Sequence, residues 1–487
     1  MNKREFLKLM GGISLGMLPL IGCYDEQKKS TQKAQQGPAS DSTEGPDLPD
    51  ITDEDILLFQ KNDERYQTYV HLYNKRIARS PKYIAVCKTV KGVQYAVSLA
   101  GKEQIPVAIR SGGHSFEGFS SNDGGMMIHL GLMKTIRKNE EGSITIGSGI
   151  TLSELHDQVY AAGRMIPAGS CGGVGIAGLT LGGGYGFFSR KYGLTCDSLT
   201  DAAIVTADGT VKSAKDDPEL LWALKGGGNG SFGVVTDLTF KTYPLPKTFS
   251  SYTLKFRNLA AGKFMDLLSL WMKATGDLPK EGFGAFVLNG PTLTILFTTY
   301  NNADIHASIA ALLDAADHQS RSLDKPLVQA IRRFYGRKDP LYFKNASCGY
   351  YNDFSEFEDI GESIFDKVVQ HPGMIFQLNT LGAAINEIGN DATAYPHRDK
   401  LYLSELQAYY DRPDQEGRLL KAFEDIQQMV RNKGITAQYA NYPDVHFRNW
   451  EQAYFGLNYP KLQGIKNRLD PRNLFRYEQS IRISQET

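Results

Sequence analysis

Glycine, gathered in four short stretches, is the feature that most constrains what this chain can fold into. The 487 residues include 49 glycines, about a tenth of the chain against a usual share of about 7%. The stretches cover residues 110–115, 169–178, 182–186 and 226–233. Because glycine permits positive φ and lets backbone N–H groups approach a ligand, several such loops predict a long ligand that contains pyrophosphate. Any one stretch alone would also fit a tight turn in a glycine-rich β region.

Two of these stretches match the dinucleotide pattern GxGxxG, at 173–178 and 228–233. The second match runs into VVTDL at 234–238, which is typical of a strand. A Rossmann fingerprint must instead open a helix. We therefore do not expect a Rossmann nicotinamide site.

Residues 1–23 are typical of an export signal. Lys3, Arg4 and Lys8 precede an apolar stretch at 9–21 that is too short to span a bilayer comfortably. LIGC at 20–23 resembles a lipobox, in which the thiol of Cys23 is lipidated, and KREFLK at 3–8 resembles a twin-arginine signal. An ordinary secretory signal with a coincidental cysteine is the alternative. Residues 24–49 are polar and predict a disordered tether. We expect a bacterial lipoprotein, anchored by lipid on the periplasmic or extracellular side.

The pattern of the chain changes near residue 245, which predicts two domains of an α+β protein. Over 50–245, strands are predicted at 83–87, 105–109, 126–130 and 143–146, with a helix at 90–100. Over 246–436, amphipathic helices such as 417–432 alternate with extended segments such as 292–300 and 401–410. This predicts a substrate domain made of an antiparallel sheet covered by helices. Residues 437–487 return to aromatic and glycine-rich loops.

Charge and cysteine content exclude several function classes. The 54 Lys and Arg residues balance 54 Asp and Glu residues, so the chain has no basic footprint for nucleic acid. The cysteines form no CxxC pair or disulfide framework, and no HExxH motif occurs. We therefore expect neither a metal site nor a nucleic-acid partner. The five cysteines are Cys23, Cys87, Cys171, Cys196 and Cys348.

Taken in order, the glycine stretches form a specific joint pattern. They read PVAIRSGGHS, GSCGGVGIAG, GGGYG and LWALKGGGNGSFGVVT. This order resembles the FAD-linked oxidases related to berberine bridge enzyme, within the vanillyl-alcohol oxidase/p-cresol methylhydroxylase (PCMH) superfamily. YFGLNYP at 454–460 and DPRNLF at 470–475 resemble the segment that ends those proteins, so the resemblance runs from about 50 to 484. ATAYPHRDKLYL at 392–403 is similar to the substrate domain of oligosaccharide oxidases in this family.

The resemblance implies a PCMH-type FAD-binding domain over 50–245 with a doubly attached flavin. His114 would bond through nitrogen to the 8α-methyl carbon and Cys171 through sulfur to carbon 6. Outside this context, a phosphate-binding loop histidine and a small buried cysteine would be the ordinary interpretations. The further cofactor contacts that the resemblance implies are Arg110, Ser111, Gly112, Gly113, Ser115, Gly175, Gly178, Gly184, Tyr185, Val235 and Asn458.

The resemblance also implies the chemistry, in which hydride leaves a carbon that bears a hydroxyl while a base within about 3 Å takes the hydroxyl proton. Tyr442, in YANY at 439–442, matches the proton-abstracting tyrosine of the family. Tyr439 and Gln407 match substrate-contacting positions. Because an ordinary tyrosine has a pKa near ~10, Tyr442 needs a nearby cation, dipole or hydrogen bond to act at neutral pH.

The chain departs from the family pattern at Asn379. Oligosaccharide oxidases carry an aspartate there as partner of the tyrosine, and an amide cannot be that base; we expect Asn379 to contact substrate. Glu387 lies near the place of a glutamate that berberine bridge enzyme uses, and it is either the partner of Tyr442 or a surface charge. Val174 is a small residue at a position where small residues accompany access of O₂ to the flavin, whereas Leu179 stands where many relatives have histidine.

We therefore expect an FAD-dependent oxidase acting on CH–OH donors. It would transfer hydride from an oligosaccharide hydroxyl to covalently bound FAD, which O₂ reoxidises to give H₂O₂. Oxidation of a secondary metabolite such as an alkaloid or polyketide is an alternative. A non-catalytic lipoprotein that binds flavin or glycan is another, and it would explain the missing aspartate at Asn379.

Overall fold

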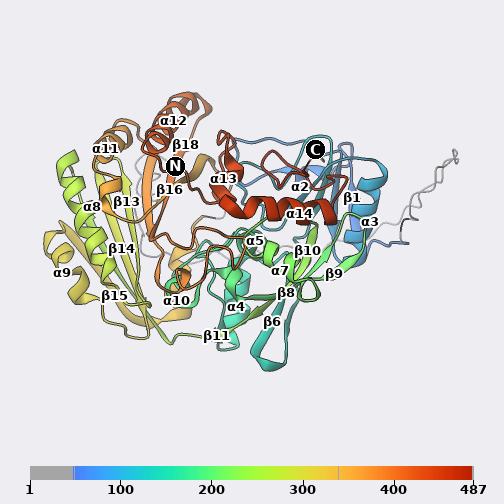
Figure 1. The fold of residues 1–487 in the computed structure, drawn as a ribbon, viewed down its shortest axis with the longest axis horizontal. Coiled ribbons are helices and arrows are strands. Elements are labelled where there is room, and N and C mark those ends of the chain that lie inside the picture. The colour runs from blue at the N-terminus through green and yellow to red at the C-terminus, as the bar shows by residue number, and fades with distance from the viewer. Residues whose placement is uncertain (1–47, 49, 338, 485–487) are drawn as a thin grey trace. The chain divides into compact units, whose positions relative to one another are not determined.

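The computed structural model describes residues 48, 50–337 and 339–484 (Figure 1). The predicted export signal, the lipidation position Cys23 and nearly all of the predicted tether lie outside these residues. Within the described ranges, no helix is both long enough and apolar enough to cross a bilayer. The domain boundaries predicted at 245 and 436 stay predictions.

A four-stranded sheet opens the described chain. Its strands are Ile56–Phe59 (β1), Tyr83–Cys87 (β2), Val107–Arg110 (β3) and Met126–His129 (β4). The order is β1-β2-β4-β3, and β4 runs parallel to both β2 and β3. Strand β2 is buried along its whole length, as an apolar YIAVC run covered on both faces should be. The helices α2 (Tyr66–Val70) and α3 (Val90–Lys102) share hydrophobic cores with this sheet.

Helix α3 shows how local sequence sets these elements. Thr89 caps the helix by accepting a hydrogen bond from the Gly92 N–H at 3.2 Å. The helix then buries a stripe of small apolar side chains, among them Val93 and Val97, against the sheet. The helix predicted at 90–100 and the strands predicted at 83–87, 105–109 and 126–130 are confirmed, with ends that differ by at most two residues.

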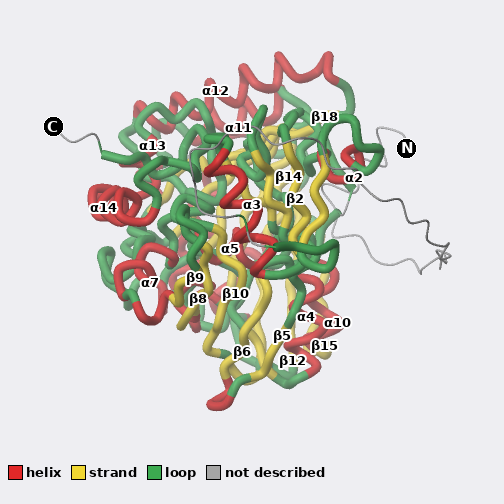
Figure 2. The backbone as a smooth tube through the Cα atoms, turned by 90° about the vertical axis from the view of Figure 1, so that its right-hand side faces the viewer, coloured by secondary structure: helices red, strands yellow, loops and turns green. Residues whose placement is uncertain are grey.

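A five-stranded sheet follows, in the order β5-β6-β10-β8-β9. These strands lie side by side in Figure 2. The C-terminal helices pack on this part of the molecule, where Trp450 and Leu462 join the same core as Ile146 and Leu238. The bounds are Ile136–Lys138 (β5), Ser143–Gly147 (β6), Leu199–Val205 (β8), Val211–Ser213 (β9), Val234–Lys241 (β10), Leu152–Ala161 (α4), Ile176–Leu181 (α5), Ser189–Tyr192 (α6), Pro218–Leu224 (α7), Trp450–Phe455 (α13) and Tyr459–Leu469 (α14), with a two-stranded pair Arg164–Met165 (β7) and Tyr243–Pro244 (β11).

The third large sheet has seven antiparallel strands in the order β15-β12-β14-β13-β17-β18-β16. Four helices, α8, α9, α11 and α12, cover its outer face, on the left of Figure 1. The predicted α+β class, with an antiparallel sheet covered by helices, is confirmed. The bounds are Thr248–Phe256 (β12), Phe283–Asn289 (β13), Thr292–Tyr300 (β14), His318–Pro326 (β15), Tyr342–Tyr351 (β16), Met374–Thr380 (β17), Tyr402–Tyr410 (β18), Ala261–Gly276 (α8), His306–Ala315 (α9), Leu327–Ile331 (α10), Gly361–Gln370 (α11) and Glu416–Asn432 (α12).

Strand alternation divides this sheet into an apolar and a polar face. On β17, Phe376 and Leu378 enter the core beneath the helices, whereas Gln377 and Asn379 point the other way. The register pairs Gln377 with Glu405 of β18. Polar side chains of the central strands are therefore gathered on the face that the helices leave open.

Candidate active site

A cavity of about 620 Å³ lies between the glycine-rich loops and the polar face of the seven-stranded sheet. This volume is in the range of cofactor and small-molecule sites. We call the cavity-lining residues of 111–115, 169–186 and 228–233 the glycine wall, and those of β16, β17 and β18 the strand wall. Residues 439–443 of the C-terminal segment line a further side.

The glycine wall is held together by backbone contact between two loops. A Cβ at Gly112 would lie 2.3 Å from the Gly175 nitrogen, and a Cβ at Gly175 would lie 2.1 Å from Ser111 Oγ. Neither position therefore has room for a side chain. At Gly178, by contrast, an added Cβ would meet nothing within 4 Å, and this residue faces the cavity. The wall thus offers a cradle that a side chain would fill.

Unpaired polar groups line the same wall. Within the described chain, the backbone N–H groups of 112–115 have no hydrogen-bond acceptor. Ser120 Oγ is buried at the cavity without a partner. Buried donors are normally satisfied, and successive N–H groups around a positive-φ glycine such as Gly113, at +74°, form a nest for anions. These residues therefore fit the phosphates of a dinucleotide cofactor such as FAD.

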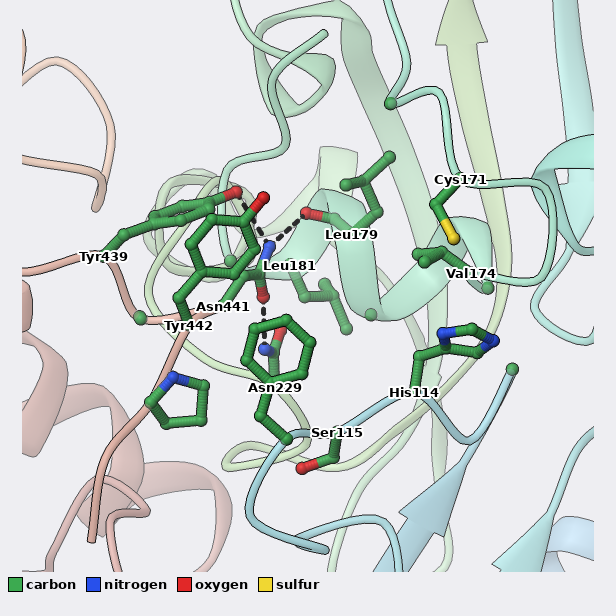
Figure 3. Close-up of a pocket in the computed structure, with 18 of the residues that line it drawn as sticks. His114, Ser115, Cys171, Val174, Leu179, Leu181, Asn229, Tyr439, Asn441 and Tyr442 are labelled. Atoms are coloured by element: carbon green, nitrogen blue, oxygen red, sulfur yellow. Dashed lines mark hydrogen bonds between the residues drawn. The ribbon is translucent and has the colours of Figure 1, made fainter. Parts of the chain in front are cut away.

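His114 and Cys171 meet at one end of the cavity, with Val174 beside them (Figure 3). The His114 ring stacks on Tyr73, with centroids 4.0 Å apart, and its Nε2 lies 2.6 Å from where a Cβ of Gly173 would stand. Burial lowers the pKa of His114 to about 4, so its ring is neutral at neutral pH. Burial raises the pKa of the Cys171 thiol. Cys171 is nevertheless partly exposed, unlike the buried Cys87, Cys196 and Cys348.

A row of hydrogen bonds joins Tyr442 to the strand wall. The hydroxyls of Tyr442 and Tyr185 are 2.9 Å apart, and Asn379 Nδ2 donates to Tyr185 Oη at 3.1 Å. Gln377 Nε2 donates to Asn379 Oδ1 at 2.8 Å, and Gln407 Nε2 donates to Gln377 Oε1 at 3.3 Å. Asn379 therefore reaches Tyr442 only through Tyr185. The row brings five residues from four segments of the chain into one polar surface: a glycine stretch, β17, β18 and the C-terminal segment.

No positively charged side chain among the described residues that line the cavity assists Tyr442. Burial raises its pKa well above the usual value, and the neighbouring Tyr185 and Glu405 raise it further. No Lys or Arg occurs among the described residues that line the cavity. The described lining therefore supplies no cation to meet the requirement stated for Tyr442, and the hydrogen bond to Tyr185 does not lower its pKa.

Tyr439 places its ring in the cavity, and its hydroxyl forms hydrogen bonds behind the glycine wall (Figure 3). Its Oη accepts hydrogen bonds from the Gly184 N–H at 2.9 Å and from Asn441 Nδ2 at 3.0 Å. Asn441 also donates to the Leu179 carbonyl at 3.0 Å and accepts from Asn229 Nδ2 at 2.6 Å. The YANY segment is thereby fastened to two glycine-rich loops.

Sequence reasoning missed Glu405, the one carboxylate among the described residues that line the cavity. It is 7% exposed, and Asn345 Nδ2 donates to its Oε1 at 3.3 Å. Burial raises its pKa to about 8. Gln407, which the resemblance implies as a substrate contact, lies two positions along the same strand, and residues at i and i+2 share a face. That alternation was the available signal for Glu405.

Four predicted site residues do not line the cavity and need correction. Glu387 is 61% exposed and forms a salt bridge with Lys280 at 2.5 Å, so it is a surface charge and not the partner of Tyr442. Gly184 makes a turn with φ +81° behind the wall. The amide of Asn458 donates to backbone carbonyls of 390–394. The guanidinium of Arg110 donates to backbone carbonyls of 69–71. Arg110 and Asn458 therefore hold loops in place.

The other predicted residues in the described chain lie at the cavity, although this placement leaves their roles as predictions. They are Ser111, Gly112, Gly113, His114, Ser115, Cys171, Val174, Gly175, Gly178, Tyr185, Val235, Asn379, Gln407, Tyr439 and Tyr442.

Comparisons with known proteins agree with this geometry. An FAD binding domain family matches residues 81–215, and a berberine and berberine-like family matches 438–482. An uncharacterised FAD-linked oxidoreductase of Bacillus subtilis is 28% identical, over 87% of this chain and 96% of its own. Glucooligosaccharide oxidase of Sarocladium strictum is also 28% identical, over 86% and 91%. In fold, the chain is similar to berberine bridge enzyme-like 1 of Physcomitrella patens, with a TM-score of 0.81, 24% identity and coverage of 89% and 98%. The chain belongs to the berberine bridge enzyme-like FAD-linked oxidoreductases, which carry a PCMH-type FAD-binding domain.

Proposed function

We propose that this protein oxidises a hydroxyl of a neutral, hydroxyl-rich substrate, an oligosaccharide, and passes the electrons to O₂. The composition of the strand wall carries this proposal. It presents amides and a phenol from Asn345, Gln377, Asn379, Gln407 and Tyr409. Such groups donate to and accept from sugar hydroxyls. An anionic substrate would instead bring a buried charge to a cavity whose described lining holds no cation to pair with it.

The residues of the glycine wall would hold FAD, with covalent bonds from His114 and Cys171. When bound, the flavin accepts hydride from the substrate carbon and delivers the electrons to O₂. The neutral imidazole of His114 leaves a ring nitrogen free to form a bond. The partial exposure of Cys171 makes it the accessible thiol among the described cysteines. The small side chain of Val174, beside these two residues, leaves room for O₂.

Tyr442 and Glu405 would handle the hydroxyl proton. Tyr442 Oη holds the substrate hydroxyl, oriented by its 2.9 Å hydrogen bond to Tyr185. Glu405 replaces the predicted Glu387 as the carboxylate of the site, because it lines the cavity and its pKa of about 8 lies near working pH. The proton leaves the substrate oxygen and ends on the ionised Glu405 carboxylate.

Anaerobic bleaching of the flavin absorbance tests the reaction. Purified protein should bleach with neutral oligosaccharides, and admission of air should restore the colour and release H₂O₂. Bleaching by oligosaccharides but no H₂O₂ would show another electron acceptor. Absence of bleaching with every sugar and aromatic alcohol offered would leave a flavin- or glycan-binding protein and overturn the proposal.

Acid denaturation tests the attachment of the flavin. The wild-type protein should keep its yellow colour in the acid precipitate, and His114→Ala or Cys171→Ala should each leave one bond. Release of all flavin from the wild-type protein into the supernatant would contradict both bonds.

An aromatic secondary metabolite is the second candidate substrate. Phe187, Phe283 and Phe334 line the cavity, and their rings lie in edge contact, with centroids 5.3 Å (187 to 283) and 4.9 Å (187 to 334) apart. Rings in this arrangement would pack against an aromatic ligand. Faster bleaching by aromatic alcohols than by oligosaccharides would favour this candidate.

We further propose that the protein is exported and anchored by lipid on Cys23. Mass spectrometry of the mature N-terminus should find diacylglycerol on this cysteine, and Cys23→Ser should release the protein from the membrane fraction. A mature, unlipidated N-terminus at another residue would contradict the anchor.

A further inference from the structure

Lys344 of β16 bridges two buried carboxylates from distant segments of the chain. Its Nζ contacts Glu117 Oε1 and lies 2.7 Å from Asp444 Oδ1. The side chains of Lys344, Glu117 and Asp444 are 3%, 3% and 0% exposed. Arg76 pairs with the other oxygen of Glu117 at 2.8 Å, so two cations balance two anions. We call these four residues the Lys344 cluster.

The Lys344 cluster lies outside the cavity lining but next to it along the chain. Lys344 belongs to the strand wall segment, Glu117 to the loop that follows the glycine stretch at 110–115, and Asp444 to the C-terminal segment. Each has cavity-lining residues as sequence neighbours. These neighbours are Phe343 and Asn345 for Lys344, Phe116 for Glu117, and Tyr442 and Pro443 for Asp444.

Tyr442 is placed by contacts with the same two partner segments. Its ring stacks on Phe116, with centroids 5.2 Å apart and planes 18° apart. Its carbonyl accepts a hydrogen bond from the Ser347 N–H of β16 at 2.8 Å. The loop after the glycine stretch and strand β16 therefore hold Tyr442 from two sides, and the Lys344 cluster joins these two segments to the backbone just after Tyr442.

We propose that Lys344 is a positioning residue, which sets the place of Tyr442 by tying the C-terminal segment to the strand wall and the glycine loop. The proposal rests on the proposed function, in which Tyr442 holds the substrate hydroxyl. A buried ion pair is weak evidence for a purely stabilising role, because neutral residues of similar volume often replace it at little cost. The ionic contacts add a defined arrangement of the backbone, since they hold three segments together at one point.

The test uses the flavin-loaded full chain and the double variant Lys344→Met/Asp444→Asn. This variant keeps the Arg76–Glu117 pair and leaves no uncompensated charge. The matched control is Arg398→Met/Asp197→Asn, which removes a buried pair of 1% and 7% exposure whose members do not line the cavity. Hydrogen exchange over residues 438–449 is measured together with kcat and KM for steady-state oxidation of substrate under air.

The expected result is at least tenfold faster exchange over 438–449 and at least a tenfold lower kcat, with KM changed less than threefold and flavin content retained. The control should leave exchange at 438–449 and kcat near wild-type values. Wild-type exchange in the double variant, or an equal loss of kcat in the control, would overturn the proposal. If the double variant does not fold, the single variant Asp444→Asn is tested by the same criteria, because its side chain keeps an acceptor oxygen. If no sugar bleaches the wild-type flavin, the proposed function fails, and the exchange result alone decides the positioning role.

Discussion

The glycine wall and the strand wall face each other across one cavity but are built in opposite ways. In the glycine wall, backbone atoms of Gly112 and Gly175 lie so close that neither residue can carry a Cβ. In the strand wall, the backbone hydrogen bonds are used for pairing between strands, and side chains such as Gln377 and Glu405 line the cavity. The shape of the glycine wall depends on positions without a side chain, whereas the properties of the strand wall depend on which side chains it carries.

This difference separates what the fold must keep from what it can vary. A residue larger than glycine at Gly112 or Gly175 would push the loops apart and change the cofactor cradle. A change in the strand wall leaves the backbone pairing intact, because Asn379 pairs with Leu403 through backbone atoms and not through its side chain. Substrate preference can therefore change on the strand wall without disturbing how the cofactor is held.

The largest effect is expected in the glycine wall, for Gly175→Ala. The new Cβ would lie 2.1 Å from Ser111 Oγ and 2.4 Å from the Gly112 nitrogen, so the loops must separate. We expect the yield of flavin-loaded protein to fall more than tenfold, as measured by absorbance of flavin per mole of folded chain.

Gly178→Leu is the matched control within the same wall. Its side chain enters open cavity space, since a Cβ there meets no chain atom within 4 Å. Thermal stability without flavin should stay near that of wild type, while flavin content falls. If Gly175→Ala and Gly178→Leu destabilised the protein equally, this would contradict the inference that Gly175 is needed for contact between loops and Gly178 for space for the cofactor.

The next largest effect is expected on the other side of the cavity, for Tyr442→Phe. The substitution keeps the stack on Phe116 and removes the hydroxyl that contacts Tyr185 at 2.9 Å. Flavin content should be unchanged, and the rate of anaerobic flavin reduction should fall by about 10²–10⁴-fold, the usual contribution of a positioned acid–base group.

Two controls isolate this effect. Tyr350→Phe removes a buried hydroxyl that contacts Tyr395 and does not line the cavity, and Glu387→Gln changes a surface charge. Both variants should reduce their flavin at rates near wild type. A Tyr442→Phe protein as fast as these controls would show that the proton is handled elsewhere.

The same contrast explains how much the sequence could predict. The cradle was predictable because a backbone-built wall demands glycine at fixed positions. Apart from Glu387, 15 of the 18 described residues that the resemblance implies for cofactor, substrate, oxygen and base contacts line the cavity. Arg110 and Asn458 show the limit of such local patterns. Both sit in the right motifs, yet their side chains bind backbone carbonyls away from the cavity.

The strand wall was less predictable because long-range register decides which side chains meet. The residues next to Glu405 in sequence do not predict that it lies opposite Gln377. Nor do they predict that burial without a cation raises its pKa to about 8. Glu387 lies near a family position in sequence, but in the fold it follows the end of β17 and is exposed to solvent. The sheet itself was predictable, since apolar alternation on one face requires only local residues.

The third effect concerns pH and the charge of the strand wall. Burial raises the folded-state pKa of Glu405 from 4.5 to about 8. This group therefore favours folding most below pH 4.5, and its contribution is lost as pH rises through about 8. Glu405→Gln should remove that loss, so the variant should gain a few kcal/mol relative to wild type between pH 5 and pH 9, as measured by denaturant unfolding.

Flavin reduction gives the matching kinetic signature. The wild-type rate should rise through pH 8 as Glu405 ionises, and Glu405→Gln should lack this rise and be about 10²-fold slower at pH 9. If the variant kept the wild-type pH profile, Glu405 would not take part in proton transfer. The prediction for stability would not be affected.

The smallest effect tests whether the two walls serve separate half-reactions. Val174 belongs to the glycine wall and lies beside His114 and Cys171, on the side away from Tyr442 in Figure 3. Val174→Ile adds one methylene where O₂ would approach, which should slow reoxidation of the reduced flavin by about tenfold, the effect of one methylene in a fitted pocket. Anaerobic reduction by substrate should keep its wild-type rate, because the strand wall and Tyr442 are untouched. Stopped-flow measurement of the two half-reactions separates these outcomes. Equal slowing of both would mean that the added methylene displaces the cofactor itself, and the glycine wall would then govern substrate oxidation as well as oxygen access.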